Sequence, residues 1–182
     1  MRKLFVCMSS GLLISSLTSA VLPIRASVTP EISSHKFSNV IAATDQSALI
    51  KKNKNLLLTN RTLARKIATK LGIVSAGEVP TSGTPLEQNE VLILQNQETF
   101  KEIAVKVGAK VPALTAVTAA DQAEKNHQLL LQNRSIVVEI LKKLSIPAAA
   151  PAALTGTFVD KNHTLLVGNG KALAKIAAKL GV

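Results

Sequence analysis

The sequence contains few of the residue types on which most binding and catalytic sites depend. Its 182 residues include no tryptophan or tyrosine, four phenylalanines, one cysteine and three histidines. So few aromatic rings leave almost no surface on which the bases of single-stranded nucleic acid could stack, and nucleic acid is not an expected partner. Catalysis by a nucleophile needs a base beside it, and zinc needs a set of histidine or cysteine ligands. The sequence shows neither pattern and predicts a protein that is not an enzyme and has no metal or cofactor.

The segment 1–26 has the three parts of a secretory signal peptide. Arg2 and Lys3 precede an apolar stretch, and Ala20 and Ala26 are the candidate cleavage points. Removal of this segment leaves no cysteine, so the fold must be stable without disulfides, and it leaves no transmembrane segment. It also leaves 19 basic residues against 11 acidic ones. We therefore predict a basic protein that is secreted, periplasmic or located in the cell envelope.

The remainder of the chain contains four near copies of one stretch, which begin at Ile50, Leu86, Ala123 and Val159 and align without gaps. The copies are 36, 37 and 36 residues apart. A fixed period of this length indicates a repeat protein in which neighbouring units share a core. The shared positions are a first asparagine (Asn53, Asn89, Asn126, Asn162), a second asparagine (Asn60, Asn96, Asn133, Asn169) and an isoleucine (Ile67, Ile103, Ile140, Ile176).

Local sequence signals predict that each copy folds as strand, turn, strand and helix. The first asparagine is suited to a hairpin turn, and the apolar triplet after it is typical of a buried strand. The second asparagine precedes an amphipathic segment and is a favoured helix N-cap. Gly72, Gly108 and Gly181 mark the expected helix ends in the left-handed conformation, and Ser145, at the same position of the third copy, is the exception. The predicted fold class is α+β, an array of four ββα repeats of about 36 residues.

An all-α fold of helical repeats is the alternative, because the same residues fit a seven-residue register. The apolar series in the first copy is Ile50, Leu57, Ala64 and Leu71, and the complementary coiled-coil series is Asn53, Asn60 and Ile67. The stretch "VGNG" in the last copy argues against one continuous helix, since each glycine inside a helix costs about 1 kcal/mol. The predicted segments are 1–26 (signal peptide), 27–47 (polar leader or cap), 48–74, 84–110, 121–146 and 157–182 (repeats 1 to 4).

His127 and His163 occupy equivalent positions of the third and fourth copies, directly after the first asparagine. Lys54 and Glu90 stand at this position in the other two copies. Because the position accepts several polar residues, we predict that both histidines lie in a solvated turn.

The stretch "LLVGNGKALAKIAAKLGV" at residues 165–182 resembles the first strand and helix of LysM, a secreted module that binds peptidoglycan or chitin. Gly170, Leu173, Ile176, Ala177 and Gly181 are among the residues on pattern positions. The match covers about half of such a module. The resemblance implies glycan binding as an alternative function.

Basic residues on the first and last predicted helices are the candidates for a binding site. They are Arg65, Lys66, Lys70, Lys171, Lys175 and Lys179. Lys66 and Lys175 are replaced by Glu102 and Glu139 in the middle copies, so the charge is concentrated in the terminal repeats. We predict an exported scaffold that binds an anionic cell-surface polymer, a glycan or a protein. A secreted factor that acts on a host or partner protein is a third possibility.

Overall fold

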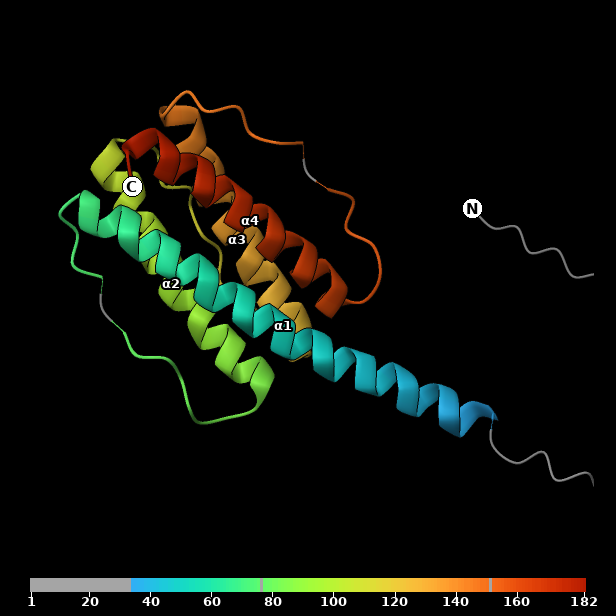
Figure 1. Cartoon of the computed structure of the whole chain (residues 1–182). Helices are drawn as coiled ribbons and strands as arrows, with labels where there is room; N and C mark the ends of the chain where they lie inside the picture. Colours follow the sequence, from blue (N-terminus) through green and yellow to red (C-terminus); the bar gives the residue numbers. More distant parts are fainter. Residues whose placement is uncertain (1–33, 76, 151) are drawn as a thin grey trace, which may run out of the picture. The chain divides into compact units, whose positions relative to one another are not determined.

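The four repeats form four helices, and the strands expected from the sequence are absent from the residues that the structure describes. The structure is a computed structural model that describes residues 34–75, 77–150 and 152–182. Helix α1 spans Ser34–Lys70, α2 spans Pro85–Val107, α3 spans Gln122–Lys143 and α4 spans Phe158–Leu180 (Figure 1). The ββα prediction is wrong, and the helical-repeat alternative fits. The predicted signal peptide lies outside the described residues, and residues 34–47 of the predicted leader belong to α1.

All four helices point in the same direction (Figure 1). Asn53 of α1 donates a hydrogen bond to the main-chain oxygen of Val159 in α4, and Asn60 donates to that of Leu166. Donor and acceptor both advance by one heptad between the two bonds, so these two helices are parallel and in register. Equivalent bonds join α2 to α1, α3 to α2 and α4 to α3. The helices therefore form a closed ring, a parallel four-helix bundle within the unit His35–Val182.

The seven-residue register explains why each repeat is one helix with a buried seam. Four residues one turn after the first asparagines, Leu57, Ile93, Leu130 and Leu166, are each at most 2% exposed and form one layer of the core. The shared isoleucines are buried in a second apolar cluster nearer the C-terminal end of the helices. Between the first asparagines and the leucine layer, the axis has a cavity of only about 10 Å³. At this level the axis is therefore filled by side chains.

Both sets of asparagines lie in the middle of helices, not in hairpin turns or at N-caps. All eight are at most 4% exposed. For seven of them, the side-chain nitrogen donates to a main-chain oxygen of the adjacent helix, one turn before that helix's own asparagine. Each bond supplies a partner for a buried amide N–H, which would otherwise be costly to bury. The sequence interpretation failed because these partners belong to other repeats.

His127 and His163 also lie inside helices, so the prediction of a solvated turn is wrong. The Nδ1 atom of His127 is 3.1 Å from the side-chain oxygen of Asn162, and Nδ1 of His163 is 2.9 Å from that of Asn53. Each histidine thus pairs with the first asparagine of the next helix around the ring. His127 is 9% exposed and also packs against the ring of Phe158, with 5.5 Å between the ring centroids.

The helix ends predicted at the three glycines are confirmed, and Ser145, the expected exception, behaves in the same way. Gly72, Gly108 and Gly181 have φ angles of 73°, 71° and 69°, and Ser145 adopts the same left-handed conformation at 55°. In each case the next residue along the chain donates its N–H to the main-chain oxygen of the residue five positions before that donor, as Ile73 does to Ala68. This bond closes the last turn in all four helices. The helix starts have caps that the sequence interpretation did not identify, namely Thr84, Asp121 and Thr157.

Three long connectors of equal length, 71–84, 108–121 and 144–157, return the chain from the end of one helix to the start of the next. Antiparallel neighbours can be joined by about two to eight residues, whereas a parallel arrangement requires the chain to travel back along the whole helix. The seam between α4 and α1 closes the ring without a connector between those two helices. This seam therefore differs from the other three.

Candidate functional site

The parallel arrangement brings the last turns of all four helices to one end of the bundle. We call the cations in the last two turns of each helix the basic end. They are Arg65, Lys66, Lys70, Lys101, Lys106, Lys142, Lys143, Lys175 and Lys179. Only two carboxylates, Glu102 and Glu139, lie in the same turns. Among these cations, all except Arg65 and Lys101 are exposed, so most of the charge faces solvent.

The opposite end of the bundle is balanced in charge. Residues 48–55 of α1, together with the caps and first two turns of the other helices, contain five acidic residues and five lysines. Two of the carboxylates are parts of capping boxes. Hydrogen bonds from the main chain and side chain of Thr84 lower the pKa of Glu87, and those of Thr157, its side chain first, lower the pKa of Asp160. The bundle thus has a neutral end and a strongly positive end.

Helix dipoles account for only part of the charge at the basic end. Each helix C-terminus carries roughly half a negative charge, so four of them together carry roughly two. Lysines in the last turn offset this partial charge and stabilise the helices. The net excess of seven cations is several times larger than that requirement. The remaining positive charge is available to attract an anionic partner.

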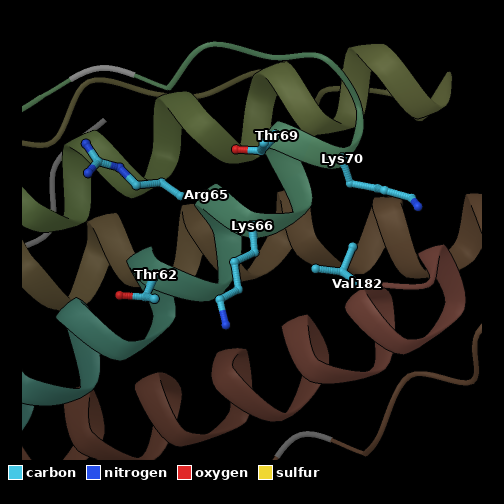
Figure 2. Close-up of a pocket in the computed structure, with 6 residues that line it drawn as sticks. All are labelled: Thr62, Arg65, Lys66, Thr69, Lys70 and Val182. Carbon is cyan, nitrogen blue, oxygen red and sulfur yellow. The ribbon is translucent and has the colours of Figure 1, made fainter.

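The structure distributes the six predicted binding residues over the two terminal helices. Arg65, Lys66 and Lys70 line an open hollow of about 580 Å³ on α1, together with Thr62, Thr69 and Val182 (Figure 2). Arg65 and Lys66 leave the helix on opposite sides (Figure 2). Lys171 and Lys175 line a different cavity, between α3 and α4. Lys179 lies in the last turn of α4. The six residues therefore do not converge on one pocket.

Arg65 has a structural contact in addition to its charge. It donates from Nη2 to the main-chain oxygen of Gly77 at 2.7 Å, and Arg61 donates to the same oxygen. Burial, and then the nearby cation of Arg65, lower the pKa of Arg61. These two arginines hold the first connector against α1.

Sequence interpretation did not place Lys106, Lys142 and Lys143 in a binding surface. The recurring lysine of the last turn, Lys70, Lys106, Lys143 and Lys179, was visible as a partner for the helix dipole. Whether these lysines also form one charged surface depends on the relative direction of the helices. In a parallel bundle these four lysines gather at one end, whereas an alternating bundle would divide them between two.

The cavity between α3 and α4 has a volume of about 490 Å³, and we call it the connector groove. Its walls come from α3, α4 and the third connector. Leu141 and Ala172 are buried at its floor, whereas Lys171 and Lys175 are exposed. The groove therefore passes from an apolar interior to a positively charged mouth.

Within the residues that the structure describes, no group of histidine, cysteine, aspartate or glutamate side chains could hold a metal ion. In the same part of the chain, no helix combines the length and apolar character needed to cross a membrane. Comparison of the chain with protein-family models, with curated proteins and with solved structures found no match.

Proposed function

We propose that this protein is an exported, non-enzymatic scaffold that docks on an anionic polymer of the cell surface through its basic end. The observation that supports this proposal most directly is the collection of nine cations and two carboxylates at one end of a bundle whose other end is balanced. A surface with such a net charge attracts polyanions and raises their association rate.

The connectors add to this support. The chain uses three long connectors to keep its helices parallel, although short loops would suffice for an alternating bundle. Ordering long connectors costs conformational entropy. A function that requires one basic end gives a reason for this architecture, since parallel helices alone bring the four last-turn lysines together.

Sedimentation with isolated cell-wall sacculi, before and after chemical removal of their anionic polymers, tests the proposal. We expect the protein to sediment only with sacculi that retain the anionic polymers. Binding should weaken from low salt to about 0.5 M salt, because exposed charges are screened over roughly 10 Å at 0.1 M and over less at higher salt. Replacement of Lys70, Lys106, Lys143 and Lys179 by glutamine should lower the affinity at least about tenfold, a loss of roughly 1.4 kcal/mol or more.

A matched variant separates the basic end from overall charge. Lys51, Lys52, Lys54 and Lys161 lie toward the neutral end, and their replacement by glutamine removes the same four charges. We expect this variant to bind nearly as well as the unmodified protein. Equal losses in the two variants, or sedimentation that does not depend on the anionic polymers, would contradict the proposal.

The resemblance to LysM does not extend to the fold. Residues 165–168, where the resemblance implies a strand, belong to α4. Glycan binding therefore lacks the structural support that the resemblance had offered. An action on a host or partner protein stays a prediction, and an acidic protein surface would use the same basic end.

A further inference from the structure

The three connectors are attached to the bundle in different ways. Gln95 of α2 donates to the main-chain oxygen of Glu78 in the first connector at 3.0 Å. Gln132, the equivalent residue of α3, donates to that of Thr115 in the second connector at 2.7 Å. The equivalent residue of α4 is Gly168. The fourth repeat therefore lacks the glutamine that donates to the preceding connector in the second and third repeats.

The connector groove lies at this position, and Gly168 is one of its lining residues. A Cβ atom added at Gly168 would meet no atom within 4 Å, which shows that the space beside it is open. Among the residues that the structure describes, the connector contributes small or apolar side chains here, namely Ala149, Ala150, Ala152 and Leu154. A volume of about 490 Å³ is within the usual range of small-molecule sites, roughly 300–1,000 Å³.

The groove has the polarity of a site for an anionic amphiphile. Its walls include Leu131, Leu165 and Val167, which could cover an apolar chain. Its charged lining residues are Arg134, Lys171 and Lys175, and none of its lining residues is acidic.

Two of these cations also fix the walls of the groove. Arg134 donates to the main-chain oxygen of Gly168 at 3.4 Å, and Lys175 donates to that of Pro147 at 3.3 Å. Guanidinium and ammonium groups at such positions can bind a carboxylate while the helices supply an apolar surface.

We propose that the connector groove binds one free long-chain carboxylate, with its acyl chain along the apolar walls and its carboxylate at the cationic mouth. This site differs from the basic end in its chemistry, because a hydrophilic polymer would not fill an apolar groove. A neutral apolar ligand would not use the three cations. The charge and the apolar walls together select a single-chain anionic amphiphile.

Titration of the purified protein with cis-parinaric acid, a fluorescent long-chain carboxylate, tests this proposal. We expect a saturable rise in fluorescence at one equivalent. Gly168→Gln should lower the affinity at least tenfold, because the new side chain can reach the third connector as Gln95 and Gln132 reach theirs. Lys171→Glu should also weaken binding several-fold, and the alcohol with the same chain should bind less tightly than the acid.

The control is Thr59→Gln, the same substitution at the equivalent exposed position of α1. Among the described residues, α1 is the first helix and no connector leads into it, so this variant should bind like the unmodified protein. Glutamine is a better helix former than glycine, so Gly168→Gln should fold at least as stably. If it does not fold, Lys171→Glu decides the question alone.

Unchanged affinity in Gly168→Gln, or in Lys171→Glu where the first does not fold, would overturn the proposal. Binding of several equivalents with no effect of either substitution would do the same. Binding to vesicles of anionic phospholipid is measured as well. If a bilayer lipid is the true occupant, Gly168→Gln should weaken binding to the vesicles and leave binding of the free acid unchanged, which would also overturn the proposal.

Discussion

Gly168 and Gly170 lie close together in α4, but their surroundings differ. A Cβ atom at Gly170 would approach the side-chain oxygen of Asn60 to 2.6 Å, whereas one at Gly168 would meet nothing. Asn60 is buried and donates to the main-chain oxygen of Leu166, so it cannot move without losing that bond. The glycines that argued against a helix from the sequence thus have separate roles, a close helix contact at Gly170 and an open groove at Gly168.

The two glycines predict opposite responses to the same substitution. Gly168→Ala should raise the free energy of unfolding by about 1 kcal/mol, the gain expected from replacing glycine inside a helix. Gly170→Ala should lose that gain and destabilise the protein, because the new methyl group displaces Asn60 and leaves a buried amide without its partner. Urea denaturation of the two variants measures both values. A gain of about 1 kcal/mol in each would show that the contact between Gly170 and Asn60 is unimportant.

His127 and His163 predict a dependence of stability on pH. Burial is the main cause that lowers the pKa of both from the usual 6.5. The hydrogen bond with Asn162 and the charge of Glu124 act in the opposite direction at His127, and Lys161 acts with burial. At His163, Lys52 acts with burial and Asp160 against it.

Because the folded pKa of each histidine lies below the unfolded one, the unfolded chain binds more protons as the pH falls through 6.5. The free energy of unfolding should therefore be highest above this pH and should decrease on acidification, until the folded histidines are protonated as well. Urea denaturation at about pH 8 and about pH 5.5 measures the change. The carboxylates of Glu87 and Asp160, whose pKa values are lowered, titrate below this window.

The double variant His127→Gln and His163→Gln isolates this effect. Glutamine can still donate to the oxygens of Asn162 and Asn53 but does not titrate. We expect the double variant to lose most of the decrease in stability between the two pH values. The same decrease in the variant and in the unmodified protein would assign the pH dependence to other groups.

At the scale of the helix, the sequence predicted the ends better than the interior. The C-terminal glycines, Ser145 and the last-turn lysines are local signals, because a helix end is determined by residues within one turn. The interior of each repeat was assigned to strands, because asparagine beside an apolar triplet is also typical of a hairpin. The deciding contacts, such as the bond from Asn96 to the main-chain oxygen of Leu57, connect residues 39 apart in the chain.

For the candidate site too, the local signals could be predicted from the sequence, whereas the arrangement in space could not. Arg65, Lys66, Lys70, Lys171, Lys175 and Lys179 could be selected from the sequence as clusters of charge on two helices. Their separation into an open hollow and a connector groove could not, because it depends on which helices are neighbours and where a connector crosses them. Gly168 stands where the second and third repeats have Gln95 and Gln132. This difference points to a groove only once those two glutamines are seen to donate to their connectors.

For the whole molecule, we expect the eight buried asparagines to specify one register at a cost in stability. The lateral bonds of seven of them connect all four helices in a ring. A shift of one helix by a turn would separate the side-chain pairs of His127 with Asn162 and of His163 with Asn53. Even in the native arrangement, the side-chain oxygens of Asn96, Asn133 and Asn169 are buried with no hydrogen-bond partner within the protein. A buried polar layer of this kind is known to specify register and helix number in coiled coils.

Removal of the second asparagine layer should therefore make the protein more stable but leave its helices without a single register. Replacement of Asn60, Asn96, Asn133 and Asn169 by leucine should raise the free energy of unfolding by about 1 kcal/mol or more for each substitution, because a buried leucine contributes roughly 1.5–3 kcal/mol. The lateral bond lost at the first three positions subtracts roughly 1 kcal/mol. Urea denaturation measures the gain. The amide ¹H–¹⁵N spectrum should show broadened or multiple peaks, because an apolar layer no longer distinguishes one register from another.

Conversion of the isoleucine layer provides the control for this variant. Ile67, Ile103, Ile140 and Ile176 occupy the same seam one heptad later, and their replacement by leucine keeps both volume and polarity. Such isomeric changes usually cost less than about 1.5 kcal/mol each, and they leave the asparagine bonds intact. We expect this control to keep one set of sharp peaks. If the leucine-for-asparagine variant also keeps one sharp set, the register is determined by the connectors and apolar packing, and the asparagine ring is not required for it.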